Sequence, residues 1–388
     1  MKYAPLSLRM IQVYVLSMLF FTAGSVLTVV FPLQASDSGM SDGEIGVAMG
    51  SYMLVCMILR PWAGQLVAKH GALRTMLLLL VGHAVTLLVY VAFGIGSLYA
   101  VRIMQGVVTA FFSMAIQWGI ADLLADRDRG QGMSLYAISS IMPSLYGPAA
   151  ALWLWLEADR SYLPLLVASL AVVPLLLMIR SPLPQHREPG ASFTLRDMLQ
   201  ALKQAGRHRG LISASITMVA GACVFGAITT FLPLYMNREQ IGNPALYLFL
   251  QAVVVVASRF VLRKRIPSDG QWHPRFIALV LLGFAVGTAL LGFGSTLGPF
   301  VYIGALFSGL ATAMLYPTIT TYFTFAVPPA SKHMLLGVFL ATYDLGTTLG
   351  SFAMGFVVQW TSFATMFLAC AGVAALASGY AIARSRYA

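Results

Sequence analysis

The sequence predicts an all-α integral membrane protein, and three observations lead to this fold class. Hydrophobic side chains make up 59% of the 388 residues and charged side chains only 10%, which is more apolar surface than one soluble core buries. Apolar stretches of about 20 residues, the length needed to cross a hydrocarbon core as a helix, recur along the whole chain. Glycine, proline and charged residues separate these stretches, and no sizeable soluble domain is left over.

Twelve such stretches can be placed, six on each side of a polar segment. They cover about residues 10–33, 44–67, 73–94, 97–121, 131–155, 161–180, 210–236, 243–262, 274–294, 297–326, 333–358 and 362–383. The two sets resemble each other weakly, because Arg60-Pro61 precedes a basic loop in the first set and Arg259 precedes Arg263-Lys264-Arg265 in the second. Internal repeats of this kind are typical of transporter folds. We therefore predict two pseudo-symmetric six-helix halves, 1–180 and 210–388.

The segment 181–209 is predicted to link the halves on the cytoplasmic side. Apolar residues alternate there with basic ones, as in an amphipathic helix that lies in a membrane interface. The residues that form this pattern are Phe193, Leu195, Arg196, Met198, Leu199, Leu202 and Lys203.

The basic residues indicate orientation. A net charge of +11 would suggest a nucleic-acid partner in a soluble protein, but here Lys and Arg lie between apolar segments. If both termini are cytoplasmic, 19 of the 24 Lys and Arg are cytoplasmic, Arg160 and Arg238 lie outside, and Arg60, Arg102 and Arg259 lie within helices. Because cytoplasmic loops carry the excess of positive charge, we expect a multi-pass protein of a bacterial inner membrane, with both termini inside and no nucleic-acid partner.

The cysteines and the N-terminus add no further domain or site. Cys56, Cys223 and Cys370 fall inside predicted helices without metal-ligand spacing, so we expect packing residues and no metal site. The positively charged residues 1–9 precede an apolar stretch that runs to about Leu33 without a small-residue cleavage site. We therefore expect a first transmembrane helix and not a removable signal.

One predicted helix carries a stripe of polar residues. Their offsets of 0, 3, 7, 11 and 15 place them on one face at about 100° per residue; they are Arg102, Gln105, Thr109, Ser113 and Gln117. Polar side chains are expensive in hydrocarbon, so the stripe should face protein or a water-filled cavity. Hydrogen bonding between helices is the structural alternative, but an arginine at the head of the stripe favours the cavity.

Asp344 is the acidic residue placed most securely inside the membrane. A charge at the centre of a spanning helix costs about 3 kcal/mol on insertion scales, so burial favours the protonated carboxyl and suits a proton carrier. An ion pair or hydrogen bonds that make Asp344 structural are the alternative. His83 lies near the middle of its predicted helix and is a second candidate, since imidazole titrates near neutral pH; a packed, hydrogen-bonded histidine is its alternative.

Amphipathic side chains in other helices are weaker candidates, each with a structural alternative. They are Tyr14, Tyr52, Tyr136, Tyr316 and Gln251.

Three motifs resemble those of major facilitator transporters. In the segment from Arg60 to Gly71, the residues that fit the signature loop of that family are Gly64, Leu66, Lys69 and Gly71. Ala68 replaces the usual aspartate and the closing basic pair is reduced to Arg74, so the charge relay of the family's outward-facing state should be rearranged here.

The other two motifs lie inside helices. Arg102-Ile103-Met104-Gln105-Gly106 is similar to the family motif whose arginine is associated with proton transfer. Gly147-Pro148 resembles the core of the motif of proton-driven exporters, although Ala151 and Leu152 replace its final glycines. The resemblance implies twelve helices around a central cavity, alternating access, and a monomer as the transport unit.

Longer strings resemble the exporters of staphylopine-type metallophores, which are opine-type, nicotianamine-like metal chelators with several carboxylates. These strings are Ser51 to Gln65, Arg102 to Gln117, Met133 to Pro148, Ser258 to Lys264 and Met334 to Gly350. The resemblance implies proton-coupled export of a zwitterionic or anionic metallophore.

Residue roles follow from that solute. Arg102 and His83 would meet carboxylates, and Asp344 would meet an amine or carry the counter-proton. The polar residues that would line the path beside them are Gln105, Gln117, Tyr136 and Tyr316. Arg60 and Arg259 would hold a gate or attract the anionic solute from inside, and arginines that snorkel to the interface are the alternative.

Other functions remain to be weighed. A nutrient uptake symporter would share the fold, and so would a polyspecific drug/proton antiporter, although the first helix lacks a membrane-embedded acid for cationic drugs. The sequence contains no Gly-x-Gly-Asp, no His-Glu-x-x-His and no phosphate-binding Gly-x-x-x-x-Gly-Lys-Ser/Thr motif, which argues against a protease or an ATP-driven pump. The polar stripe argues against a sensor or scaffold. We therefore expect a transporter and not an enzyme, with no cofactor and an ion gradient, best protons, as its energy source.

Overall fold

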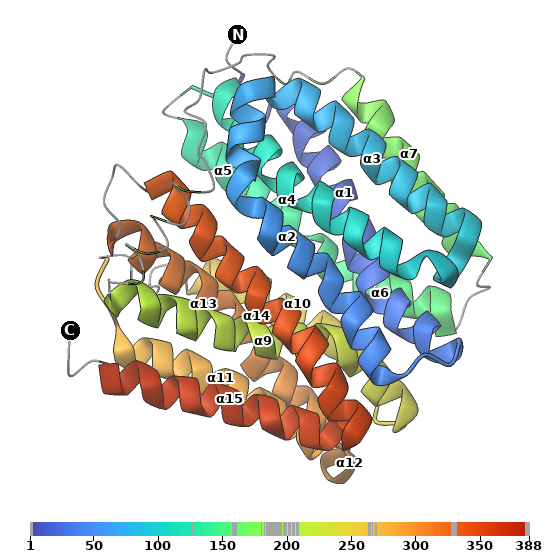
Figure 1. The fold of residues 1–388 in the computed structure, drawn as a ribbon, viewed down its shortest axis with the longest axis vertical. Helices are drawn as coiled ribbons and strands as arrows, with labels where there is room; N and C mark the ends of the chain where they lie inside the picture. The colour runs from blue at the N-terminus through green and yellow to red at the C-terminus, as the bar shows by residue number, and fades with distance from the viewer. Residues whose placement is uncertain are drawn as a thin grey trace. The chain divides into compact units, whose positions relative to one another are not determined.

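The computed structural model describes residues 3–125, 128–156, 161–179, 209–262, 270–326 and 332–384, with isolated positions at 181, 183, 196, 200, 203, 206, 265 and 267. Helices form nearly all of this part of the chain, as predicted (Figure 1). The predicted interfacial helix at 181–209 lies almost entirely outside the described residues.

The helices follow the predicted apolar stretches closely. Those of the first part are α1 (Leu8–Asp37), α2 (Asp42–His70), α3 (Ala72–Phe93), α4 (Leu98–Leu123), α5 (Arg129–Ile141), α6 (Pro143–Leu156) and α7 (Tyr162–Met178). Those of the second part are α9 (Arg209–Arg238), α10 (Pro244–Val261), α11 (Pro274–Gly292), α13 (Ile303–Ala326), α14 (Lys332–Trp360) and α15 (Phe363–Ala383). Three short turns complete the set: η1 (Gly94–Ser97), α12 (Gly294–Leu297) and η4 (Gly298–Tyr302).

Two predicted helices differ from the structure. The helix expected at 131–155 is divided at Met142 into α5 and α6, because Pro143 lacks the N–H that would continue the hydrogen-bond ladder. The helix expected from residue 297 begins instead at Ile303. Gly298 precedes it with φ +53°, a left-handed conformation that glycine adopts without strain.

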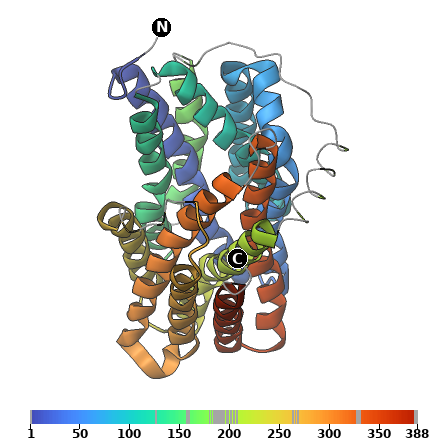
Figure 2. The same cartoon turned by 90° about the vertical axis from the view of Figure 1, so that its left-hand side faces the viewer.

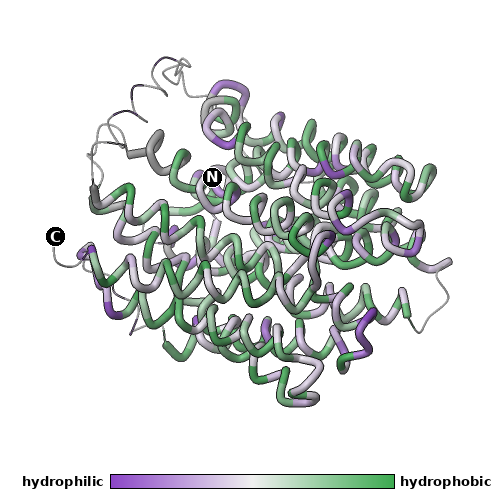
Figure 3. The backbone as a smooth tube through the Cα atoms, turned by 60° about the horizontal axis from the view of Figure 1, so that its bottom comes forward, coloured by the Kyte–Doolittle hydropathy of each residue, from purple (hydrophilic) through white to green (hydrophobic). Residues whose placement is uncertain are grey.

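The described residues contain eight candidate membrane spans by length and composition. One of them, Ala72–Leu123, includes both α3 and α4, and Tyr162–Met178 is a shorter apolar helix. Most of the strongly hydrophilic stretches lie at turns and helix ends, while the helices are largely apolar (Figure 3). The chain therefore has the character of a membrane-spanning protein, and the count of twelve spans stays a prediction.

The chain forms two compact units. Unit 1 comprises Met1–Phe31 and Ile58–Phe193, and unit 2 comprises Pro32–Met57 and Thr194–Ala388. The division passes through α1 and α2, so the turn between these helices packs within unit 2. This grouping reflects packing and not chain order, and the predicted boundaries at 180 and 210 stay a prediction.

Unit 1 is built around α3, which packs against both α4 and α7. Its helices run along one another for most of their length (Figure 2). Aromatic rings fill the interior where α1 meets α4: Phe20 stacks on Phe112 with ring centroids 3.6 Å apart. Both rings are buried, so burial of aromatic surface holds these helices together.

Unit 2 is held by close helix–helix contacts at glycines. A side chain at Gly346 would meet the Val219 carbonyl oxygen 2.5 Å from its Cβ, and one at Gly226 would meet the Thr347 carbonyl oxygen at the same distance. The backbones of α9 and α14 therefore touch, as small residues allow between membrane helices. A hydrogen bond of 2.8 Å between the hydroxyls of Thr230 and Ser351 adds to this contact.

Candidate functional site

Arg102 of α4 is enclosed by protein in unit 1. Its side chain is 3% exposed, and Nη1 donates a hydrogen bond of 3.2 Å to Gln105 Oε1, one turn along the same helix. The guanidinium carbon lies 5.4 Å from the centroid of the Phe31 ring of α1, within the range of a cation–π interaction. Arg102 and Gln105, which the sequence places on one face of the helix, are thus in contact, and an aromatic ring lies over the guanidinium.

The other residues of the predicted polar stripe, Thr109, Ser113 and Gln117, are joined by hydrogen bonds within α4. Ser113 Oγ donates to the Thr109 carbonyl at 3.2 Å, and Gln117 Nε2 donates to the Ser113 carbonyl at 2.8 Å. All three side chains are half-buried. The periodicity is present, but these bonds do not link α4 to another helix.

His83 of α3 is packed among aromatic rings. The side chain is 4% exposed, and its ring centroid lies 4.6 Å from that of Phe20. Nε2 is buried and has no hydrogen-bond partner among the described residues. These surroundings favour a packed histidine over one that meets solute.

The predicted exporter motif positions α6 against α1. A side chain at Gly147 would collide with Ser25 of α1, whose Oγ donates a hydrogen bond of 2.9 Å to the Pro143 carbonyl. Pro148 lies inside α6. Tyr136, in α5, is 8% exposed and its carbonyl accepts a hydrogen bond of 2.8 Å from Ser139 Oγ.

The predicted signature loop is mostly helical. α2 continues through His70, so Arg60 and Gly64 lie within it, and Arg60 is half-buried. Only Gly71 forms the turn, with φ +81° at the N-cap of α3. Because that backbone conformation is strained for residues with a Cβ, glycine is required at this position.

Arg259, near the end of α10, lies beside two tyrosines in unit 2. Its guanidinium interacts electrostatically with the phenols of Tyr343 and Tyr316. The rings of these tyrosines meet edge to face with centroids 5.6 Å apart, and Phe225 lies 6.4 Å from the Tyr343 ring. Four helices, α9, α10, α13 and α14, thus contribute to one cluster.

Asp344 follows Tyr343 on α14 and is 1% exposed. Its backbone carbonyl accepts hydrogen bonds from the hydroxyls of Thr347 at 2.9 Å and Thr348 at 2.8 Å. Gly346, two residues later, lies against Val219 of α9. The predicted acidic residue is therefore deeply buried, in a polar part of α14 that packs on α9. Gln251 of α10 is also buried, and its Nε2 donates to Ser308 Oγ at 3.1 Å.

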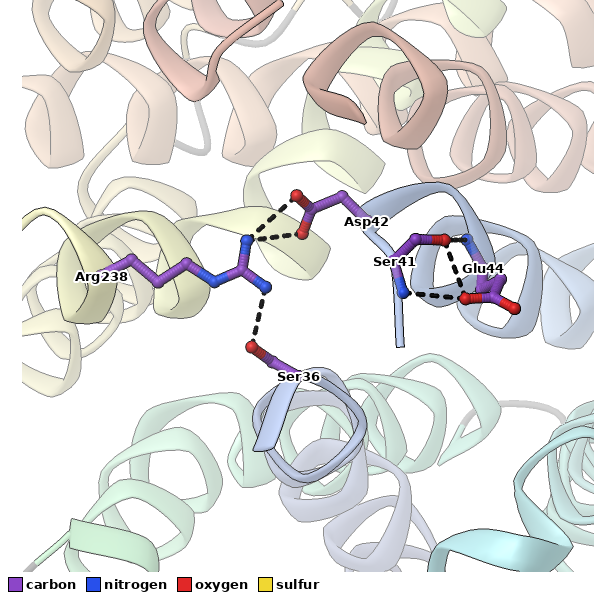
Figure 4. Close-up of polar contacts among 5 residues, drawn as sticks. All are labelled: Ser36, Ser41, Asp42, Glu44 and Arg238. Carbon is purple, nitrogen blue, oxygen red and sulfur yellow. Dashed lines mark hydrogen bonds and ion pairs between the residues drawn. The ribbon is translucent and has the colours of Figure 1, made fainter. Parts of the chain in front are cut away.

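A third arginine, at the end of α9, forms a site that the sequence did not reveal. Arg238 Nη1 donates to both carboxylate oxygens of Asp42, at 2.8 Å and 3.0 Å, and Nη2 donates to Ser36 Oγ at 2.7 Å (Figure 4). The guanidinium also lies 5.5 Å from the ring centroid of Phe363. Arg238 therefore joins the turn between α1 and α2 to the ends of α9 and α15.

The structure thus brings the candidates together in two groups. Arg102 and Gln105 meet in unit 1, and Arg259 and Tyr316 meet in unit 2 beside Tyr343. Sequence reasoning missed Asp42 and Ser36 as partners of Arg238, since 196 residues separate Asp42 from it. Within the part of the chain that the structure describes, no group of three or more His, Cys, Asp or Glu is placed to hold a metal ion.

Similar proteins cover nearly all of this chain. A staphylopine export protein of Staphylococcus aureus (strain Mu50) is 37% identical over 365 residues, which are 93% of this chain and 92% of that protein. An uncharacterized MFS-type transporter of Burkholderia mallei is 24% identical over 99% of this chain and 94% of its own length.

Solved structures share the fold at much lower sequence identity. A POT family transporter in complex with 5-aminolevulinic acid gives a TM-score of 0.78 at 11% identity, over 98% of this chain and 96% of that one. The human organic anion transporter MFSD10 gives a TM-score of 0.70 at 18% identity, over 96% and 98%. The family profile described as Major Facilitator Superfamily matches residues 13–267 and 270–386. Apolar helices, these relatives and the profile together show that the chain is a membrane transporter that belongs to the Major Facilitator Superfamily.

Proposed function

We propose that this protein is a secondary active transporter that exports an opine-type, staphylopine-like metallophore from the cytoplasm. The observation that carries the proposal is the 37% identity to a staphylopine export protein, because it extends over nine-tenths of both chains. The charged and polar side chains that lie among the helices favour a charged solute. The chain supplies a half-buried guanidinium group inside a helix at Arg259, and a guanidinium suits carboxylates.

Alternating access requires contacts that form in one state and break in another. The contacts of Arg238 with Asp42 and Ser36 have this character, since they join the ends of three helices, α1, α2 and α9, and both charged side chains retain some exposure, 35% and 16%. Exposed or half-exposed ion pairs are weak, about 0–1 kcal/mol, so transport can break them. With both termini in the cytoplasm, this contact lies on the outer side, where it ties the turn between α1 and α2 to the end of α9.

Coupling to protons is the second part of the proposal. Asp344 is the candidate proton carrier, because it is almost fully buried near the middle of α14 and a buried carboxyl favours the neutral form. No cofactor is required if the proton gradient supplies the energy. Twelve helices, a bacterial inner membrane, two cytoplasmic termini and a monomeric transport unit complete the proposed arrangement.

Inside-out membrane vesicles test this function directly, because export appears in them as uptake. We expect uptake of a labelled opine-type chelator to depend on an imposed pH gradient, and Asp344→Asn to remove that dependence at equal protein level. Uptake of cationic dyes with no effect of the chelator would favour a drug antiporter. Chelator uptake by right-side-out vesicles alone would favour a symporter for nutrients.

A further inference from the structure

The arginine of α10 differs from the enclosed arginine of α4. Arg259 is half-buried, and its Nε is buried without a hydrogen-bond partner among the described residues. It lies two residues before the end of α10 at Val261. A guanidinium in a membrane-spanning helix faces protein or a water-filled space, since contact with lipid is too costly.

The side chains around Arg259 form walls of mixed character. Tyr316 of α13, Tyr343 of α14 and Phe225 of α9 are all half-buried, so each retains a surface that protein does not cover. The two tyrosine rings meet edge to face, and both phenols interact electrostatically with the guanidinium. The Arg259 guanidinium therefore lies at the edge of an aromatic cluster.

A further polar group lies one turn along α13. Thr320 follows Tyr316 by four residues and shares its face of the helix. Its Oγ1 is buried and has no hydrogen-bond partner among the residues described. A buried hydroxyl without a hydrogen-bond partner costs free energy unless a ligand or water supplies that partner. Two buried polar atoms, Arg259 Nε and Thr320 Oγ1, thus lack a hydrogen-bond partner among the described residues, and they lie on neighbouring helices of unit 2.

The chemistry of these groups selects a carboxylate. A guanidinium presents its N–H donors in a planar fork that matches the two oxygens of a carboxylate, and a hydroxyl donates one more hydrogen bond. Aromatic walls exclude water and strengthen such charge-assisted bonds.

We propose that Arg259, flanked by Tyr316 and Tyr343, is a carboxylate-binding subsite for the transported solute, with Thr320 as an additional donor. The identity of that solute rests on the proposed function. Arg102, covered by Phe31 and bonded to Gln105, instead stabilises unit 1. The substrate's acidic groups are therefore bound by helices of the second unit.

Equilibrium binding to the purified full-length protein in lipid nanodiscs tests the subsite. The ligands are a radiolabelled opine-type chelator and analogues in which one carboxylate at a time is replaced by a carboxamide. The proteins are the wild type, Arg259→Met, Arg259→Lys and Thr320→Val, with Arg275→Met as a matched loss of an exposed arginine elsewhere in unit 2. Monodisperse elution and an unchanged Tm show that each variant is folded.

We expect Arg259→Met to weaken binding of the chelator about 10- to 100-fold, the size of a lost charge-assisted hydrogen bond. One carboxamide analogue should already bind weakly to the wild type and lose nothing further in Arg259→Met. Arg259→Lys should restore part of the affinity, and Arg275→Met should leave it within about twofold. Equal affinity of wild type and Arg259→Met for every ligand would overturn the subsite and return Arg259 to a snorkelling role.

Failure of the proposed function gives a different result. If the wild type does not bind the opine-type chelator, citrate serves as a general carboxylate, with sulfate as the anion control. A rise in Tm that citrate causes in the wild type and not in Arg259→Met supports the subsite with another solute. The same response to citrate in both proteins contradicts it.

Discussion

Arg102 and Arg259 both lie in membrane-spanning helices, but their surroundings differ. Arg102 is 3% exposed, bonded to Gln105 and covered by the Phe31 ring. Arg259 is half-buried beside two tyrosine phenols. The same residue type thus stabilises helix packing in one unit and is available to a ligand in the other.

The difference shows why an intramembrane charge is not by itself a solute site. The rule that such charges mark function identifies both arginines equally well. Exposure distinguishes them, since Arg102 is 3% exposed and Arg259 is half-buried, and exposure depends on the neighbouring helices. Substitutions in each region should therefore change different measured quantities.

The largest effect is expected where unit 2 is most tightly packed. A methyl group at Gly350 would collide with the backbone carbonyl of Cys223 on α9, which cannot move away as a flexible side chain would. Overpacking typically costs about 1–3 kcal/mol and more where backbone must shift. We expect Gly350→Ala to reduce the yield of monodisperse protein severely and to remove chelator binding with it.

Gly372→Ala on α15 is the matched control, because a Cβ there meets nothing within 4 Å. It should raise or maintain Tm in a thermal-shift assay. If Gly350→Ala has the Tm of Gly372→Ala, the cluster around Arg259 is not positioned by contact between α9 and α14.

The next prediction distinguishes Arg102 from Arg259 by how far each substitution lowers the stability of the protein. Arg102→Met removes a donor from buried Gln105, about 1–3 kcal/mol, and a cation–π contact of about 0.5–2 kcal/mol. We expect its Tm to fall by several degrees, while Arg259→Met retains the wild-type Tm and loses binding. A reversed pattern, with a stable Arg102→Met that no longer binds the chelator, would place the solute's carboxylate in unit 1.

A smaller effect is expected at the ion pair of Arg238 with Asp42. Its loss in Asp42→Asn should shift the equilibrium between the formed and the broken contact of the α1–α2 turn with α9 by up to about 1 kcal/mol, or roughly fivefold. Spin labels at positions 38 and 361, both exposed in unit 2, report this shift as a growing population at longer distance.

Glu44→Gln removes a neighbouring carboxylate that accepts hydrogen bonds from Ser41 within its own turn, and serves as the control. The distance distribution in Glu44→Gln should match the wild type. An unchanged distribution in Asp42→Asn would mean that Arg238 does not hold the turn between α1 and α2 in place.

Most of the fold follows from the sequence, because membrane helices are encoded by long local runs of apolar residues. The predicted helix at 274–294 is observed at 274–292, and that at 362–383 begins one residue later. The break before Pro143 and the turn at Gly298 were missed, although a proline marks each of them, Pro143 itself and Pro299. The contact of Arg102 with Gln105 could be expected from their spacing of three residues along one helix.

The cluster around Arg259 could not be predicted in the same way. It needs side chains from four helices, and the sequence gives no local pattern that places Tyr343 or Phe225 beside Arg259. The pairing of Arg238 with Asp42 is equally non-local. Tertiary contacts decide which of several plausible polar residues share a site, and periodicity within one helix does not report them.

The most direct test is the distribution of an opine-type metallophore across the membrane of cells that make it. Intracellular and extracellular pools should be measured in cells with this protein, in a deletion strain, and in deletion strains that express the wild type or Asp344→Asn at matched levels. The chelator should accumulate inside on deletion and return to the medium with the wild type but not with Asp344→Asn. Unchanged pools on deletion would contradict export of this solute class.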